Sequence, residues 1–358
     1  MIDREIIQQR LKNQRLTPNQ FKKPEQVVAW LGAVQAQDYH GALWALGLRL
    51  RGSTQPVVER AFQEGRILRT HVLRPTWHFV APHDIRWMLA LTAPHVHRLN
   101  DSIYRIQGID SEVYKRSRKI IVKALQGENQ LTRGELASLF ESSGVKIDNG
   151  LRLGYILMRA ELDGIICSGP RRGKQFTYML LDERAPASKT LSKPEALAEL
   201  AARYFTSRGP ASLKDFAGWS GLSMADARTA LEAVNHKLES EEINGQPCWF
   251  PQTRTRELPR SSFVYLLSIY DEYISGYKDR TSMDVGFSRQ LFAMGNALQY
   301  IIVMDGFFVG TWKRMINKDA VIMQMKYFKK LNQPEKLAVL HAADRYGEFL
   351  ELPVMLSA

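Results

Sequence analysis

Cysteine is nearly absent from this chain, with only Cys167 and Cys248 among 358 residues. The two lie far apart, no CxxC pair occurs, and neither has a histidine at metal-ligand spacing. The sequence therefore supports neither a disulfide framework nor a zinc site. So little cysteine fits a reducing compartment, and we expect no bound metal.

Long apolar runs are also missing. The first sixteen residues are charged throughout and contain no apolar core of a signal peptide. No stretch approaches the roughly 18 consecutive apolar residues of a transmembrane helix. We therefore expect a cytoplasmic protein that makes no use of a membrane.

Several nucleotide and catalytic motifs are absent too. The sequence contains no P-loop, no GxGxxG, no HExxH and no GxSxG. These absences argue against nucleotide-driven and zinc-dependent chemistry, and we expect no cofactor.

Acidic residues are fewer than basic ones. The chain has 49 Lys and Arg against 37 Asp and Glu, which gives a formal charge of +12 and a pI near 9.6. This excess favours a polyanionic partner, nucleic acid first. Many bacterial proteins are simply basic, so charge alone leaves nucleic-acid binding open.

One pattern recurs about three times along the chain: a pair of helices followed by two short strands, which is typical of a winged helix. The middle copy has the capping-box spacing at Thr132 and Glu135 and predicts strands over 165–167 and 175–181. The hairpin loop between these strands carries three cations, as a DNA-contacting wing does: Arg171, Arg172 and Lys174.

The other copies differ in their hairpins. The third closes at Asn244-Gly245, a strong type I′ turn signal, and the first bends around Arg74-Pro75. Beyond them, a hairpin at Asp305-Gly306, a third strand and a closing helix predict a small antiparallel β-sheet or barrel. The predicted fold is α+β, with three tandem winged-helix units and a C-terminal β module: 1–110, 111–188, 189–252 and 253–358.

Two glutamines form the first candidate site. Residues 24–34 have helical apolar spacing, and Gln35 and Gln37 fall at the end of this predicted helix. Residues two apart do not share a helix face, so both amides reach one ligand only if the helix stops or turns near Ala36. A solvated helix terminus explains the same residues without any function.

Two further stretches mix aromatic and polar residues. In the first wing, strand alternation places Arg74, Thr76 and His78 on one face, although ordinary surface residues would look the same. The stretch 271–280, DEYISGYKDR, suits a loop that stacks bases or holds phosphates. Helical packing of its tyrosines explains the same letters. The DNA-binding candidates in this stretch are Tyr277, Lys278 and Arg280.

Three stretches, AVQAQDYHGALWALGLRLRG, HVLRPTWHFVAPHDIRWMLAL and DEYISGYKDR, resemble the winged-helix DNA glycosylases of the AlkZ and YcaQ type. The resemblance covers nearly the whole chain. It implies three winged helices and a C-terminal β-barrel around a DNA channel, with a Gln-x-Gln or Gln-x-Asp catalytic motif. That motif falls here on Gln35 and Gln37, and the Gln-x-Gln form is closer to the branch associated with self-resistance to a natural alkylating agent.

The resemblance implies a monofunctional glycosylase, acting as a monomer, that removes bulky N7-alkylated purines from double-stranded DNA, with interstrand crosslinks as a further candidate substrate. Two other functions stay open. The chain is alternatively a non-catalytic winged-helix transcriptional regulator, in which the glutamines merely end a helix. A third alternative is a DNA-binding repair accessory protein, a function that gives no reason for the two amides at Gln35 and Gln37. Release of free base from alkylated duplex DNA distinguishes the three.

Overall fold

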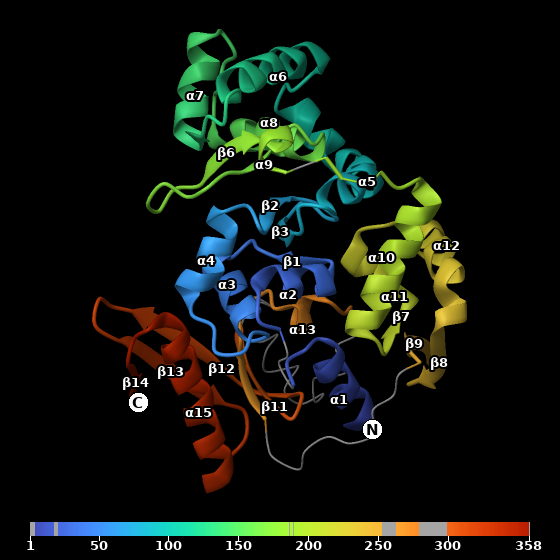
Figure 1. The fold of residues 1–358 in the computed structure, drawn as a ribbon, viewed down its shortest axis with the longest axis vertical. Helices are drawn as coiled ribbons and strands as arrows, with labels where there is room; N and C mark the ends of the chain where they lie inside the picture. The colour runs from blue at the N-terminus through green and yellow to red at the C-terminus, as the bar shows by residue number, and fades with distance from the viewer. Residues whose placement is uncertain are drawn as a thin grey trace.

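Three segments of the chain repeat one arrangement, in which a helix and a short strand precede two helices and a hairpin. The structure is a computed structural model, and it describes residues 4–17, 21–185, 187–188, 190–252, 263–278 and 299–357. In Figure 1 the first unit lies in the middle, the second above it, the third to the right and the C-terminal sheet at the lower left. The predicted α+β class is confirmed.

The first unit follows α1 (Arg4–Asn13) and comprises α2 (Pro24–Leu31), β1 (Ala33–Gln35), α3 (Tyr39–Gly47), α4 (Gln55–Gln63), β2 (Leu68–His71) and β3 (Trp77–Val80). The long helix α5 (Ile85–Ile106) leads from it to the second unit. The strand order in the sheet is β1-β3-β2, so the last strand lies in the middle.

The second unit comprises α6 (Ser111–Leu125), β4 (Leu131–Thr132), α7 (Arg133–Ser142), α8 (Gly150–Leu162), β5 (Ile166–Ser168) and β6 (Thr177–Leu180), followed by α9 (Leu181–Arg184). The third comprises α10 (Lys193–Arg208), β7 (Ala211–Ser212), α11 (Leu213–Ser220), α12 (Met224–Val234), η1 (Asn235–Lys237), β8 (Leu238–Ile243) and β9 (Gln246–Pro251). Their sheets have the orders β4-β6-β5 and β7-β9-β8, which repeat the order of the first unit.

Local sequence signals account for much of this regularity. The Thr132 hydroxyl accepts from the N–H of Glu135, whose carboxylate accepts from the N–H of Thr132, so the predicted capping box is confirmed. Asn244 and Gly245 both adopt positive φ, at 51° and 74°, between β8 and β9. A type I′ turn requires that conformation at both central residues.

The C-terminal module is an open sheet in the described part of the chain, so of the predicted antiparallel sheet or barrel the sheet is confirmed, apart from one parallel pair, and the barrel is wrong. Its strands, in the order β10-β11-β12-β13-β14, are β10 (Val264–Leu267), β11 (Tyr300–Met304), β12 (Phe307–Ile316), β13 (Val321–Tyr327) and β14 (Val354–Ser357). β14 pairs with β13 in parallel because α15 (Gln333–Leu350) forms the crossover between them.

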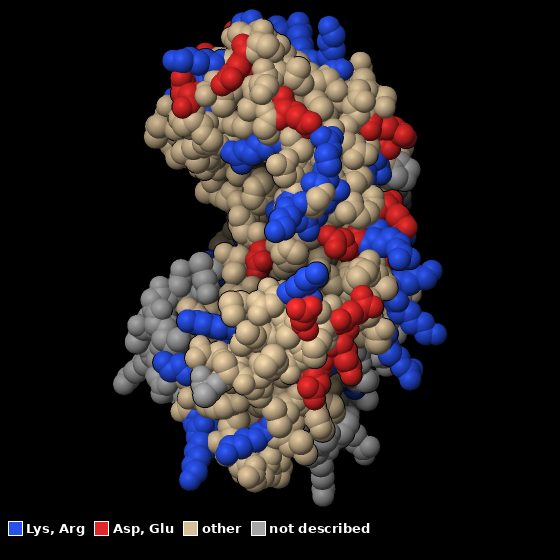
Figure 2. Space-filling model, turned by 90° about the vertical axis from the view of Figure 1, so that its left-hand side faces the viewer, with Lys and Arg blue, Asp and Glu red and all other residues tan. Residues whose placement is uncertain are grey.

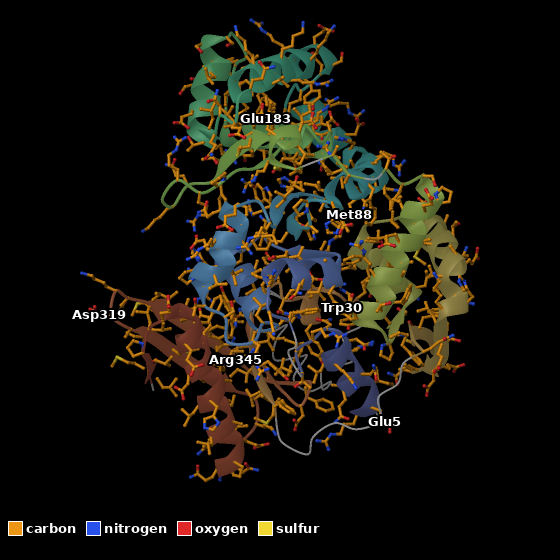
Figure 3. All side chains as sticks on the ribbon, viewed as in Figure 1. Glu5, Trp30, Met88, Glu183, Asp319 and Arg345 are labelled. Atoms are coloured by element: carbon orange, nitrogen blue, oxygen red, sulfur yellow. The ribbon has the colours of Figure 1, made fainter. Side chains whose placement is uncertain are left out.

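The first unit shares its interior with its neighbours. Its helices α2 and α3 share a core with the C-terminal sheet and α15, which includes Trp44, Trp312 and Tyr346. Its wing and α5 share a second core with the third unit, and Met88 belongs to this core where α5 passes toward α10 (Figure 3). The second unit has a core of its own. Segments from three modules therefore surround the first unit.

None of the helices in the described ranges is both long enough and apolar enough to span a bilayer.

Candidate active site

The two glutamines lie at the end of a strand, not of a helix. α2 ends at Leu31 because Gly32 leaves helical geometry with a φ of +77°, so the predicted helix over 24–34 is too long. β1 follows, and its pairing with β3 extends to Ala36, whose N–H donates to the carbonyl of Trp77 at 2.7 Å. The chain thus leaves helical geometry before Gln35, as joint action of the two amides requires. Gln37 follows in the bend after β1.

Both amides contact the turn between β2 and β3. Gln35 is 8% exposed, and its Oε1 accepts from Nη2 of Arg74 at 3.3 Å. Gln37 is exposed, and its Oε1 accepts from the N–H of Trp77 at 3.4 Å. One amide is thus buried and held by a cation, while the other is open to solvent.

His78 stands opposite Gln35 in the pairing of β1 with β3, and its side chain is fully buried. Nδ1 lies 2.9 Å from the carbonyl of Thr76, so Nδ1 carries the proton and Nε2 faces Arg74 at 3.5 Å as an acceptor. Burial, and then the charge of Arg74, hold the pKa of His78 well below the ordinary value of 6.5. The imidazole is therefore neutral at neutral pH.

This pKa predicts acid lability. Below pH 6.5 the unfolded chain binds a proton at residue 78 and the folded protein does not, so the stability that neutral His78 contributes is lost as pH falls. The loss approaches about 1.4 kcal/mol per pH unit for one proton. Thermal melts at pH 7.5, 6.5 and 5.5 should show a smaller acid loss for His78→Gln than for the wild type. His236→Gln, at an exposed position of η1, should keep the wild-type loss. Equal acid losses in all three proteins would contradict the assignment.

The Arg74 turn also contacts the third unit, since Nη1 of Arg74 lies 3.4 Å from the carbonyl of Gly218. Three polar atoms of the turn are buried and lack a hydrogen-bond partner among the described residues: Nε of Arg74, Oγ1 of Thr76 and Nε1 of Trp77. Buried polar atoms are normally paired with protein, water or ligand. The turn therefore has polar groups, beside the two amides, that remain available to water or a ligand.

The predicted wing of the second unit is only partly available to a ligand. Arg171 is 10% exposed, pairs with Glu59 at 3.0 Å and lies over the ring of Tyr39, so it joins the wing to the first unit. Arg172 is exposed but pairs with Glu135 at 2.7 Å, and Lys174 is exposed. Figure 2 shows acidic and basic side chains interspersed on one face of the molecule, without a continuous basic patch there.

Packing accounts for the tyrosines of the stretch 271–280. Tyr277 is buried and its hydroxyl donates to the carbonyl of Arg208 at 2.7 Å, and its ring contacts that of Tyr273 edge-on. Lys278 is exposed and approaches Gly218 closely. Arg280 lies outside the described residues.

Sequence reasoning missed a buried carboxylate behind the amides. Glu272, in α13 (Glu272–Ser275), is fully buried, and its Oε1 accepts from the backbone N–H of Gln35 at 2.9 Å. The two residues are 237 positions apart. No local pattern indicates such a contact, since the letters around Glu272 fit a surface loop equally well.

Metal-ligating clusters and clefts were the other candidate sites among the described residues. They contain no group of three His, Cys, Asp or Glu side chains that would hold a metal. A cleft of about 380 Å³ lies between α5 and the Leu162–Gly164 segment, and its lining includes none of the predicted site residues.

Comparison with known proteins identifies the class. The model of a family described as DNA glycosylase AlkZ-like matches residues 28–349, most of the chain. The protein belongs to the AlkZ-like DNA glycosylase family, which confirms the resemblance and implies DNA as the substrate.

Individual relatives agree. The interstrand DNA cross-link repair glycosylase of Streptomyces sahachiroi is 24% identical over 333 residues, which cover 89% of each chain. The solved structure of the Streptomyces sahachiroi DNA glycosylase AlkZ matches with a TM-score of 0.82 and 23% identity, and covers both chains completely. At that identity the structural match supports the fold.

Proposed function

We propose that this protein is a monofunctional DNA glycosylase that hydrolyses the N-glycosidic bond of bulky N7-alkylated purines in duplex DNA, with Gln35 and Gln37 as its catalytic residues. The observation that carries the proposal is the position of the two amides, at the end of β1 and in the bend that follows it, beside Arg74 and a neutral His78. Release of free base from alkylated duplex DNA tests it.

Neutral amides suit this reaction because an N7-alkylated guanine already carries positive charge. The electron pair of the glycosidic bond stays with the base, which leaves as a neutral molecule without a protonating acid. The sugar becomes oxocarbenium-like, water adds to its anomeric carbon, and the proton of that water passes to solvent. What the protein must supply is an acceptor that orients the water and a dipole that stabilises the cation, and amide oxygens provide both.

The two amides make different contacts, and we assign them different roles. Gln37 is exposed and uses one acceptor position of Oε1 for the N–H of Trp77, so a second position is free for the attacking water. Gln35 is held by Arg74 and orients the sugar. A guanidinium beside a developing sugar cation is unfavourable unless an anion pairs with it, so Arg74 binds the phosphate that flanks the lesion.

His78 and Thr76 line the same turn, next to the lesion. A protonated histidine would repel both the alkylated base and the sugar cation in the transition state. Burial keeps His78 neutral, and this preserves the electrostatics that departure of a cationic base requires.

The three repeated units act as winged helices that hold the duplex mainly through its phosphates, with Arg172, Lys174 and Lys278 among the contacts, and a monomer suffices. Interstrand crosslinks are the further substrate we propose. A base tethered to the opposite strand cannot be flipped freely into a closed pocket, and the exposure of Gln37 suits an open site. The Streptomyces relative is named as a cross-link repair glycosylase.

Replacing Arg172 and Lys174 together with alanine should weaken duplex binding, since each lost phosphate contact lowers the salt slope by about 0.9. The expected change is about 1.8 in the slope of log K against log salt, measured by titration at several salt concentrations. Arg171→Ala is the matched control, because the Arg171 side chain is buried between Glu59 and the ring of Tyr39, whereas that of Arg172 is exposed. It should lower the melting temperature and leave the slope unchanged. A wild-type slope in the double variant would exclude the second wing from DNA binding.

A further inference from the structure

β1, the strand that carries Gln35, has no strand on its outer side in the part of the chain that the structure describes. The sheet order β1-β3-β2 places it at an edge. Backbone groups alternate between the two sides of a strand, and the N–H of Ala36 points to β3, so the N–H of Gln35 and the carbonyl of Ala33 point outward. Both residues are buried, so these outward groups need partners inside the protein.

A buried ion pair occupies the place of the missing strand. Glu272 accepts from the N–H of Gln35 at 2.9 Å, and Nη2 of Arg208 donates to the carbonyl of Ala33 at 3.2 Å. Nη1 of Arg208 also donates to the carbonyl of Leu31, at the end of α2, at 2.8 Å. The pair is joined through Oε2 of Glu272, and both side chains are fully buried. One acceptor and one donor thus serve the outer edge of β1, and a second donor serves the end of α2.

We propose that Glu272 is a positioning residue for Gln35, a role that rests on the proposed glycosylase function. Three donors converge on its two oxygens: the N–H of Gln35, Nη2 of Arg208 and Nε1 of Trp219 at 3.0 Å. Only a carboxylate, which accepts and never donates, satisfies all three. It fixes the backbone from which Gln35 projects toward Arg74.

Stability alone does not explain the pair. Taking two charges out of water costs free energy that their mutual attraction often fails to recover. Apolar residues of similar volume frequently stabilise a fold as much as a buried ion pair does. Apolar residues would leave the N–H of Gln35 and the carbonyl of Ala33 unpaired. The pair therefore orders the strand that bears the amide, and it connects that strand to α10 and α11 of the third unit.

The neighbouring residue provides a matched control. Asp271 forms an equally buried pair with Arg49, through two contacts of 2.8 and 2.9 Å. Arg49 also donates to Gln14 and to the carbonyl of Ala45, and not to β1. Asp271→Asn perturbs a buried pair of the same kind beside Glu272, keeps an oxygen that accepts from the N–H of Tyr273 at the start of α13, and removes no contact to β1.

Glu272→Gln leaves one acceptor oxygen facing three donors, so the backbone at Gln35 loses its defined geometry, while Ala36 and Gln37 keep their contacts with Trp77. Single-turnover excision from a methylated duplex should slow by about 10- to 100-fold, the range for displacement of a reacting group by about an ångström. The dissociation constant for the duplex should stay within about three-fold, because phosphate contacts dominate affinity. Asp271→Asn should keep the wild-type rate per folded molecule, with folding followed by circular dichroism.

A double-variant cycle separates positioning from general damage. In a Gln35→Ala background the side chain that Glu272 positions is gone, so Glu272→Gln should slow excision by no more than about two-fold further. If Glu272→Gln slows excision as much in the Gln35→Ala background as it does in the wild type, the proposal is wrong. It is also wrong if Glu272→Gln alone keeps the wild-type rate.

Hydrogen exchange provides a readout that does not depend on activity. The backbone N–H of Gln35 should exchange faster in Glu272→Gln than in the wild type, and at the wild-type rate in Asp271→Asn. If the wild type releases no base from any alkylated duplex, the glycosylase proposal fails, while exchange still decides whether Glu272 orders β1. Unchanged exchange in Glu272→Gln overturns the role of Glu272 whatever the activity.

Discussion

Replacing Gln37 with alanine should slow release of N7-methylguanine from duplex DNA by about 10- to 1000-fold, equal to about 1.4 to 4 kcal/mol of activation free energy. Gln35→Ala should fall in the same range. An oriented water and a stabilised sugar cation matter only in the transition state, whereas neutral amides contribute little to an affinity dominated by phosphates. Folding and duplex affinity should therefore change little in either variant.

Single-turnover excision on a methylated duplex, with binding measured on the same preparations, tests this expectation. Gln126→Ala, at an exposed position after α6, is the control and should keep the wild-type rate. Gln37→Asp should retain partial activity, because the resemblance implies relatives with Asp at that position. Unchanged rates in both alanine variants would refute the catalytic assignment. No excision by the wild type on any alkylated duplex would favour the regulator.

The sequence predicted those features that depend on neighbouring residues. Thr132 and Glu135 form a capping box because three-residue spacing suffices for it, and Asn244-Gly245 turns because those two residues tolerate positive φ. The extent of α2 was wrong for a related reason. The apolar spacing continues to Val34, while Gly32 ends the helix and the chain pairs instead with β3.

The features that the sequence did not predict depend on contacts between residues that are distant in the sequence. Arg171 looks like a free cation of a wing, but Glu59 and Tyr39, distant in sequence, bury it. Glu272 looks like a loop acid, yet it lies against Gln35. The parallel pairing of β14 likewise depends on the packing of α15 and not on strand propensity. The two glutamines were recognisable from a short motif. The side chains that order the backbone at Gln35 come from α10, α11 and α13, which are distant in the sequence.

Gly221→Ala should be among the most damaging single changes outside the amides. Gly221 ends α11 with a φ of +71°, and a Cβ there would overlap the carbonyl oxygen of Leu73. The left-handed conformation costs roughly 1–2 kcal/mol for a residue with a Cβ, and the overlap adds about 1–3 kcal/mol, so stability should fall by about 2 to 5 kcal/mol. Because Leu73 precedes Arg74, the displaced turn should also move the guanidinium away from Gln35 and slow excision.

Gly127→Ala measures the cost of the left-handed backbone conformation alone, without an overlap between the new Cβ and a neighbouring atom. Gly127 has a φ of +76°, close to that of Gly221, but nothing lies within 4 Å of the position that a Cβ would take there. Its substitution should therefore cost only the roughly 1–2 kcal/mol of the left-handed conformation and leave excision unchanged. Thermal melts and single-turnover assays on the two variants measure both effects. Equal melting temperatures would mean that the Leu73–Arg74 turn yields at little cost, and then the third unit does not fix Arg74 against the amide of Gln35.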